Sequence, residues 1–496
     1  MTRKPWRLCL ESLLAAVLFS AAPAWAAAVA LGFDDARHLL NRTGFAAGID
    51  EVNAFAQLTR EQAVGRLLSE AGKPAIMPPP DWVADRMVPP RELRAMSDEQ
   101  RKAERDLLSR RGLELREWWL QEMLTTSSSL TEKMTLFWHN HFVSSQQKVR
   151  YPQLMYRQNA LLRHHALGNF GDLLHAVAKD PAMVIYLDSA SNRKAQPNEN
   201  FAREVMELFT LGEGHYTERA VKEAARAFTG WSMDPARGEF LFRRFQHDDG
   251  VKTVLGRSGN FDGDAVLDIL LAQPQTAEFI VAKLWREFVS PVPDPQEVKR
   301  VAGVFRDSRY ELRPALRALL TSDAFYAPQN RAALIKSPVE LVVGTLRQFG
   351  FTTGALTPLV FTTARLGQNI FSPPNVKGWL GGEAWINSTT LLARKQFIGR
   401  VFRADEMQPV PAAMAGAGGG LKGAGGLGSD ARQRLLQGMA DLHFDGDKWL
   451  FQFINTEADG VRRLLLASAP VNPLQPGMQG MALIRHLTQD PAYQLK

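Results

Sequence analysis

The feature that most restricts the fold of this chain is a recurrent set of helix start and stop signals, with very few signals for strands. The clearest signal is Ser337-Pro338-Val339-Glu340, in which serine caps a helix, proline takes the first helical position and glutamate caps reciprocally. Gly350 is expected to end that helix. Thr217 predicts the start of a second helix, and Ser129 with Glu132 predicts a third.

Strand signals are restricted to two short stretches. Residues 239–242 and 252–255 alternate in polarity, which predicts one small hairpin. The expected fold class is mainly α, a large multi-helix globular body with at most a small β-hairpin. A chain of 496 residues exceeds one ordinary core, so either one large helical body or two fused helical lobes are expected.

The N-terminus is typical of a secretory signal peptide. A basic stretch, residues 1–7, precedes an apolar run at about 13–22 and the small residues Ala24 and Ala26, so cleavage is expected after Ala26. The apolar run is shorter than the about 20 residues that span a bilayer core, although an uncleaved, tilted anchor is the alternative. We expect a periplasmic or secreted protein without stable membrane insertion after cleavage.

Cysteine content and charge exclude several classes of function. The only cysteine, Cys9, lies in the predicted signal peptide, so the mature chain has no thiol for a disulfide, a metal ligand or a nucleophile. The formal net charge is +7, and basic residues alternate with acidic ones, as in residues 101–106. A nucleic-acid partner is not expected, because such proteins gather Lys and Arg on one face.

Changes in composition divide the chain into four segments. Residues 412–430 are rich in Gly and Ala and predict a flexible segment. The expected division is therefore a signal peptide at 1–26, a helical core domain at 27–411, the flexible segment at 412–430 and a helical extension at 431–496.

The block from Asn198 to Gly212 predicts a capped amphipathic helix with four charged residues on one arc. The spacing of three of them is also that of a surface ion-pair ladder, which contributes only a few tenths of a kcal/mol per pair. As the catalytic alternative, two carboxylates on one face suit general acid/base chemistry. The charged residues are Glu199, Arg203, Glu204 and Glu207.

His139 and His141 are candidate ligands for one divalent metal ion. Two histidines one residue apart chelate a metal when the backbone is extended. On a helix they would point about 200° apart and could not share an ion. Either the helix ends by Asn140 and the pair converges, or one histidine faces a polar cavity while the other packs in the core.

Loop residues complete the candidate site, because function concentrates on loops held by a rigid scaffold. His247 is expected to join Glu204 and Glu207 as a catalytic residue, and His215 lies in a second glycine-rich loop. The aromatic loop at 372–388 either stacks a sugar or packs against a neighbouring helix. The expected substrate-binding residues are Asn200, Arg203, Asp248, Lys252, Trp379 and Trp385.

Five blocks of the sequence, taken in order, resemble the large bacterial family catalogued as domain of unknown function 1800. They are Phe137-Trp-His-Asn-His-Phe142, residues 198–212 with Tyr216-Thr217, Ala227-Phe-Thr-Gly-Trp231, residues 247–253, and Pro373-Pro-Asn-Val-Lys-Gly-Trp379. The resemblance spans about residues 33–400. It implies a helical exported protein of unestablished activity, often encoded beside an exported family that is similar to sulfatases and alkaline phosphatases. It supplies no catalytic residue.

The leading hypothesis is an exported, hydrolase-like enzyme. Glu204 or Glu207 would act as general acid/base, and His139, His141 or His247 would position a water, a metal or an anionic substrate. One alternative is a non-catalytic partner of the sulfatase-like protein, and another is a cell-envelope glycan-binding protein. Both alternatives use the aromatic loop of Trp379 and Trp385 as the contact.

Overall fold

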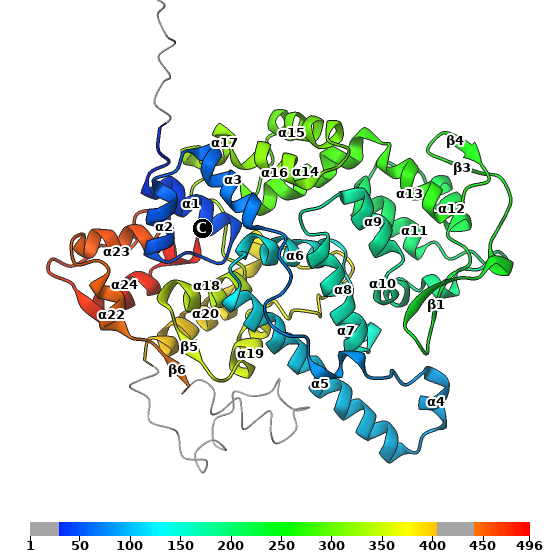
Figure 1. Ribbon diagram of the computed structural model, residues 1–496, viewed down its shortest axis with the longest axis horizontal. Coiled ribbons are helices and arrows are strands. Elements are labelled where there is room, and N and C mark those ends of the chain that lie inside the picture. Colours follow the sequence, from blue (N-terminus) through cyan, green and yellow to red (C-terminus); the bar gives the residue numbers. More distant parts are fainter. Residues whose placement is uncertain (1–28, 404–440) are drawn as a thin grey trace, which may run out of the picture.

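The computed structural model describes residues 29–403 and 441–496, which form an elongated assembly of packed helices (Figure 1). The predicted signal peptide and the Gly/Ala-rich segment at 412–430 lie outside the described residues. Helices dominate the described part, and its strands form three two-stranded sheets. The prediction of a mainly α fold is confirmed.

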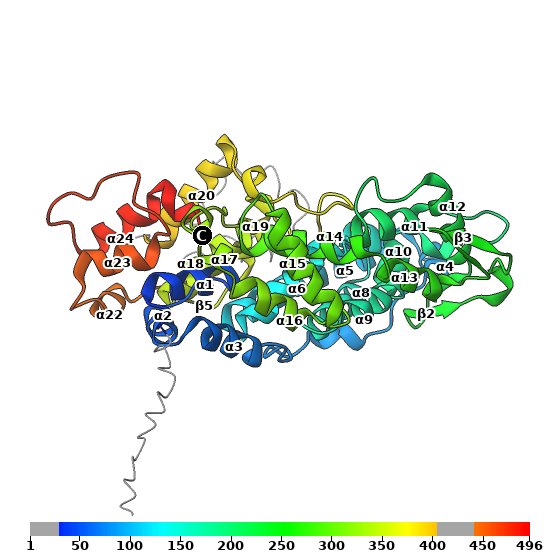
Figure 2. The same cartoon turned by 90° about the horizontal axis from the view of Figure 1, so that it is seen from above.

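In both views, helices α1 and α2 share one end of the molecule with α22, α23 and α24, whereas α4 lies toward the other end (Figures 1 and 2). The first elements are α1 (Phe33–Thr43), α2 (Ile49–Ala56), α3 (Arg60–Glu70), η1 (Asp81–Ala84), α4 (Pro90–Ala95) and α5 (Asp98–Thr125). The last are β5 (Thr352–Thr353), α19 (Thr357–Arg365), η6 (Gly382–Trp385), α20 (Ser388–Val401), β6 (Leu442–His443), α22 (Gly446–Phe451), α23 (Glu457–Leu465), α24 (Gly480–Gln489) and η8 (Pro491–Gln494).

The middle of the chain supplies the other end and the centre. Its first elements are α6 (Ser129–His141), α7 (Gln146–Val149), α8 (Pro152–His164), α9 (Phe170–Ala178), α10 (Pro181–Tyr186), η2 (Ser189–Ser191), α11 (Asn200–Glu204), η3 (Val205–Thr210) and α12 (Glu218–Ala227). Then come β1 (Trp231–Asp234), β2 (Glu239–Phe242), η4 (Arg244–Gln246), β3 (Lys252–Val254), β4 (Arg257–Gly259), α13 (Gly263–Leu271), α14 (Pro274–Phe288), α15 (Pro295–Asp307), α16 (Leu312–Leu320), α17 (Asp323–Tyr326), η5 (Pro328–Asn330) and α18 (Pro338–Phe349).

Capping chemistry places the helix ends close to where the sequence predicts them. Ser337 and Glu340 form the expected capping box of α18, and Gly350 ends it with φ of 68°. The Thr217 hydroxyl accepts the N–H of Ala220 at the start of α12. At α6 the expectation was wrong in detail, because Ser129 is the first helical residue and its hydroxyl accepts a hydrogen bond from Arg347.

The predicted hairpin is wrong in its pairing. Strand β2 pairs with β1, and β3 pairs with β4, so the two predicted strands belong to different antiparallel hairpins. Trp231-Ser-Met-Asp234, the partner of β2, also alternates in polarity, whereas the partner of β3 at 257–259 has only three residues. A third pair joins β5 to β6.

One connected set of buried residues extends from Ala36 in α1 to Tyr493 in η8. Arg347 of α18 ties the end of α5 to it by donating to the carbonyls of Met123 (3.1 Å), Leu124 (2.9 Å) and Thr126 (3.1 Å). Three carbonyls that lack helical partners are thereby satisfied. The C-terminal helices therefore pack on the same core as the N-terminal ones.

A buried group of charges crosses this core. Glu340 of α18 pairs with both Lys133 of α6 and Lys496, and Lys133 also pairs with Glu287 of α14. The two cations lower the pKa of Glu340 against the effect of burial, which alone would raise it. Segments far apart in the sequence are thus joined by charge as well as by apolar packing.

We searched the described helices for one that could cross a membrane, and no single helix there is long and apolar enough. Helices α13 and α14 meet the length and composition criteria only when taken together, and they are bent by 73° at the break between them.

Candidate active site

Three of the sequence blocks meet at the C-terminal end of α6. The side chain of Asn140 holds the loop before η6: its Oδ1 accepts the N–H of Trp379 (2.7 Å) and its Nδ2 donates to the Trp379 carbonyl (3.1 Å). Gly378 has φ of 77°, and a Cβ there would lie 2.3 Å from Asn140 Oδ1. The loop can approach the helix this closely only because residue 378 is glycine.

The histidines on either side of Asn140 hold two further segments. Nε2 of His139 accepts the N–H of Phe371 (3.2 Å). His141 lies 3.2 Å through Nε2 from the Phe209 carbonyl and 3.0 Å through Nδ1 from Lys283 Nζ. Because a carbonyl only accepts, Nε2 carries the proton and Nδ1 is the acceptor. This assigns a neutral His141.

The structure does not bring His139 and His141 together as a metal pair. Helix α6 continues through His141, so His139 faces Trp119 and Phe371 while His141 packs against Phe142. Both nitrogens of His141 are engaged, and burial lowers the pKa of both imidazoles, to about 3 for His139. Within residues 29–403 and 441–496, no group of three or more His, Cys, Asp or Glu could hold a metal ion.

The block at 198–212 forms a short α-helix, α11, followed by a π-helical turn, η3. The Leu211 N–H bonds to the Met206 carbonyl five residues earlier (2.8 Å), and the Thr210 hydroxyl donates to the Val205 carbonyl (2.6 Å). Phe201, Val205 and Phe209 are buried, so the predicted amphipathic arrangement is confirmed. A π turn inside a helix is rare and is frequent at functional sites.

Glu204 ends α11 and Glu207 lies on the π turn that follows, both half-buried and in different environments. Burial and the nearby Glu207 raise the pKa of Glu204, while Arg203 and Lys377 oppose that rise. Glu207 accepts a hydrogen bond from the hydroxyl of Tyr216. Burial and this bond raise the pKa of Tyr216 to about 12. Lys377, from the loop held by Asn140, lies 3.8 Å from Glu213.

The other predicted residues of the block have structural partners. Arg203 donates to both oxygens of Glu218 (2.8 Å each) and to Glu199 (3.1 Å). The Asn200 amide donates to the Leu187 carbonyl (3.2 Å). The ion-pair arrangement therefore exists, but it runs from Glu199 through Arg203 to Glu218 and does not include Glu207.

His247, Asp248 and Lys252 form a separate cluster at the other end of α12. His247 is buried and donates from Nδ1 to the Thr229 carbonyl (2.9 Å), while Asp248 pairs with Arg226 (2.7 Å). Lys252 donates to the carbonyls of Asp248 and Phe261. Among the contacts of the described residues, none joins this cluster to Glu204 or Glu207. The predicted catalytic group is thus not assembled around His247.

The two tryptophans predicted to bind substrate are buried. Only 5% of Trp379 and 8% of Trp385 is exposed. Trp379 packs against His139, with ring centroids 5.8 Å apart, and Trp385 covers the positive-φ Gly367. In this arrangement the rings anchor the loop and do not present a stacking surface.

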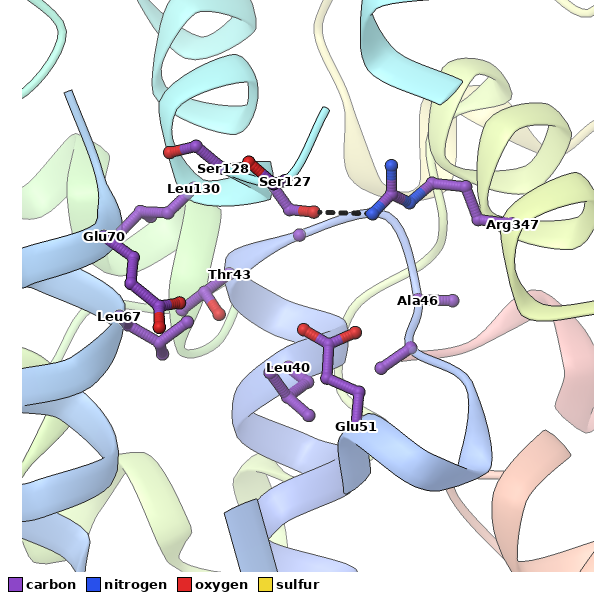
Figure 3. Close-up of a pocket in the computed structure, with 13 residues that line it drawn as sticks. Leu40, Thr43, Ala46, Glu51, Leu67, Glu70, Ser127, Ser128, Leu130 and Arg347 are labelled. Carbon is purple, nitrogen blue, oxygen red and sulfur yellow. Dashed lines mark hydrogen bonds between the residues drawn. The ribbon is translucent and has the colours of Figure 1, made fainter. Parts of the chain in front are cut away.

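Two hollows show where a ligand has room. One, of about 440 Å³, lies beside Tyr216 and is lined also by His215, Arg219 and Thr253. The other, of about 190 Å³, lies where α1, α2 and α3 meet α6, with the carboxylates of Glu51 and Glu70 pointing into it (Figure 3). Only the first is linked to Glu207, through the hydroxyl of Tyr216, and neither Glu204 nor Glu207 lines it.

Sequence reasoning missed Lys283 as a member of this region. Its amine lies 3.2 Å from the Leu208 carbonyl and 4.9 Å from the Phe279 ring. Burial, followed by the nearby Arg286, lowers its pKa to about 7. The available signal was a lysine on the otherwise apolar arc formed by Phe279, Ile280 and Leu284 of α14.

The comparisons with known proteins identify a family but no activity. The sequence model described as protein of unknown function (DUF1800) matches residues 38–495 and so includes α6, η3 and the loop at Trp379. No curated protein and no solved structure matches the chain. Since the match covers nearly the whole length, this chain belongs to the DUF1800 family, whose function is unknown.

Proposed function

We propose that this protein is an exported, hydrolase-like enzyme whose acid/base pair is Glu204 and Glu207. The observation that carries the proposal is the different environment of two half-buried carboxyls, one at the end of α11 and one on the π turn that follows it. Among the described residues Glu204 has no hydrogen-bonding partner and a raised pKa, whereas Glu207 accepts the Tyr216 hydroxyl. Paired carboxyls in unlike environments are a pattern of general acid/base catalysis.

The roles follow from these environments. Glu204, protonated to higher pH than an ordinary glutamate, donates a proton to the departing oxygen of the substrate. Glu207, which is held by the hydroxyl of Tyr216, accepts a proton from the attacking water. Lys377 lies near Glu204 and stabilises negative charge that develops on the substrate. A substrate would approach these groups from the hollow lined by Tyr216, the residue that links that hollow to Glu207.

The two binding alternatives receive no support from the residues they require. Both the partner and the glycan hypotheses use the rings of Trp379 and Trp385, and both rings are buried. A divalent metal held by His139 and His141 has no place in the mechanism, because the two imidazoles face different neighbours.

The test is a panel of chromogenic esters, glycosides, phosphates and sulfates, assayed with the wild-type protein, Glu204→Gln and Glu207→Gln. Loss of a positioned acid or base typically reduces the rate by about 10²–10⁴-fold, so we expect each variant to lose that much kcat on any substrate found. Glu199→Gln, which alters only the ion pair with Arg203, is the matched control and should remain within about twofold. Full activity in both Gln variants would exclude the assignment.

The pH profile gives a second readout on the same substrate. Because the acid must be protonated to work, activity should fall as pH rises through the raised pKa of Glu204. The alkaline limb should therefore lie above 4.5, the usual pKa of a glutamate, and should be absent from the residual activity of Glu204→Gln.

A further inference from the structure

Exposed apolar side chains gather in one short segment of the chain. Twelve large apolar side chains are exposed in the part of the chain that the structure describes, and four of them fall within residues 241–251. Single exposed apolar residues are ordinary on a protein surface, but a group of them marks a site of interaction. This segment runs from β2 through η4 to the start of β3, and its exposed side chains are Leu241, Phe242, Phe245 and Val251.

The segment is held in place toward one end of the elongated molecule. The hairpin of β1 and β2 lies toward the end opposite α22, α23 and α24 (Figures 1 and 2). The N–H of Arg243 donates to the Gly230 carbonyl (2.7 Å). The N–H of Lys194 donates to the Gln246 carbonyl (2.8 Å), which places the loop of Lys194 beside η4. Withdrawing the exposed side chains into the core would break these bonds, so the apolar surface is a stable feature of the fold.

Basic side chains without carboxylate partners lie beside this segment. Arg193 and Lys194 are exposed, and neither forms an ion pair with any described residue. Arg243 is half-buried and likewise has no carboxylate partner in the described part of the chain. The two acids of the segment are each paired with an arginine, Asp248 with Arg226 and Asp249 with Arg244. The surface therefore carries unpaired positive charge next to apolar side chains, which complements a negatively charged partner.

We propose that this end of the molecule adsorbs reversibly to an anionic lipid bilayer. Phe245, the most exposed side chain of the segment, enters the boundary between lipid headgroups and acyl chains, and the three unpaired cations lie at the level of the phosphates. Each cation near an anionic bilayer adds to the attraction. Asp234 and Glu239 face each other at the turn of the hairpin, at the other end of β2, and so stay clear of the phosphates.

The form of this surface favours a bilayer over a folded acidic protein. A folded partner is bound most strongly where large side chains fill well-packed pockets. Neither hollow described above is lined by a residue of the segment 241–251. A bilayer needs no pocket, because exposed apolar side chains insert between its lipids.

Sedimentation with lipid vesicles tests the proposal. Protein purified after export is mixed with phosphatidylcholine vesicles that contain or lack phosphatidylglycerol. We expect binding only when phosphatidylglycerol is present, and binding should weaken as salt is raised, because salt screens the cations. Phe245→Ser should reduce the partition constant by roughly tenfold and Lys194→Gln by roughly fivefold. Binding that does not depend on phosphatidylglycerol, or no binding at all, would overturn the proposal.

Matched variants at the opposite end of the molecule provide the control. Phe451 of α22 is 70% exposed, close to the 69% of Phe245, and Lys448 of the same helix is exposed as Lys194 is. Phe451→Ser and Lys448→Gln should therefore bind vesicles as the wild type does. Equal losses in the two serine variants, or no loss in either, would show that another part of the chain binds lipid, and the proposal would be wrong.

A fluorescent dye reports insertion directly. The mature chain expected from the sequence has no cysteine, so Phe245→Cys and Phe451→Cys can each carry one nitrobenzoxadiazole dye. On phosphatidylglycerol vesicles, the dye at position 245 should brighten and shift to shorter wavelength as it leaves water, whereas the dye at 451 should not change. Unchanged emission at 245 on vesicle-bound protein would contradict insertion. Glu204→Gln should bind vesicles as the wild type does, which separates this surface from the proposed hydrolase.

Discussion

Three consecutive residues of α6 show how one polar side chain determines the position of a distant segment. His139, Asn140 and His141 bind the backbone at Phe371, Trp379 and Phe209 respectively. Each bond satisfies a peptide group that would otherwise be buried without a partner. The tripeptide therefore joins the loop before η6 and the turn η3 to one helix end, a role that differs from the metal chelation suggested by its sequence.

A buried carboxyl on α10 gives a prediction at the scale of one residue. Asp180 caps α10 by accepting the N–H of Met183 (3.0 Å), and burial raises its pKa from 3.8 to about 7. The folded state then holds the proton more tightly than the unfolded chain, so this group contributes stability below pH 3.8 that is lost as pH rises to about 7. Asp180→Asn removes that dependence.

We compare the free energy of unfolding of Asp180→Asn minus that of wild type at two pH values. This difference should be roughly 4 kcal/mol more positive at pH 8 than at pH 4, because only the wild type loses stability over that range. Urea titrations at the two pH values measure it. Asp172→Asn, at an exposed position of α9, is the control and should show the same difference from wild type at both. An Asp180→Asn difference that does not change with pH would contradict the prediction.

How far the site was predictable also depends on single residues. Glu204 and Glu207 could be identified because the helical period of their block separates a polar arc from Phe201 and Phe209. The histidine pair could not be resolved, since the outcome depended on whether α6 ended one residue earlier. Lys283 stands out locally only as a lysine on an apolar arc, and its place in the site could not be predicted, because its partners, His141 and Leu208, are 142 and 75 residues away in sequence.

At the scale of elements, the loop before η6 depends on a close fit between Gly378 and Asn140. Alanine at 378 would carry a Cβ in a left-handed backbone, 2.3 Å from Asn140 Oδ1. We expect Gly378→Ala to lower the free energy of unfolding by about 1–3 kcal/mol. Gly303→Ala, where a Cβ meets nothing within 4 Å, should be neutral or slightly stabilising.

A double-mutant cycle separates the clash from general strain. In Asn140→Ala the nearest opposing atom, Oδ1, is gone and only the backbone carbonyl at 2.8 Å remains, so Gly378→Ala should cost less in that background, with a coupling of about 0.5–3 kcal/mol. Urea unfolding of the four proteins gives the coupling. Strict additivity would show that Asn140 does not hold the loop.

The contact between α6 and α18 depends on buried charge. Glu340→Gln leaves Lys133 and Lys496 without the carboxylate they share, and breaking a buried pair in this way costs about 3–5 kcal/mol. Glu297→Gln removes the exposed pair with Arg300 and should cost about 1 kcal/mol or less. Equal, small losses of thermal stability in both variants would contradict a role for the buried charges.

Element boundaries were the most predictable part of the fold, because capping is local. The ends of α18 and α12 follow from Ser337, Gly350 and Thr217 alone. Pairing of strands was not predictable. Lys252 and Glu239 begin strands whose partners are set by turns and by packing on α12, which the alternation of polarity does not encode.

At the scale of the whole molecule, the C-terminal helices are part of the main core. Trp449 donates its indole N–H to the Gln348 carbonyl (3.0 Å), and Tyr493 lies 3.0 Å from the Thr345 hydroxyl. Composition predicted a division of the chain at 411 and 431. It could not predict that the segment after 431 packs against α18, because composition describes the local sequence and not the packing.

These contacts predict cooperative unfolding. The amides of α23 and α24 should exchange with a free energy close to that of α18, because separating them exposes buried side chains such as Leu464 and Ile484. Native-state hydrogen exchange in increasing denaturant, read by mass spectrometry, measures these free energies of exchange. If the free energy of α23 and α24 were several kcal/mol below that of α18, the extension would fold independently.

The π turn has one further consequence, for the length of the chain. Because η3 accommodates a residue more than an α-helix would, deleting a single residue between 205 and 210 would restore ordinary helical spacing with nearly every side chain retained. Each residue contributes about 100° of helical rotation, so the groups before and after the deletion would no longer face the same neighbours. At this turn, evolution is expected to tolerate exchange of side chains more readily than loss of one position.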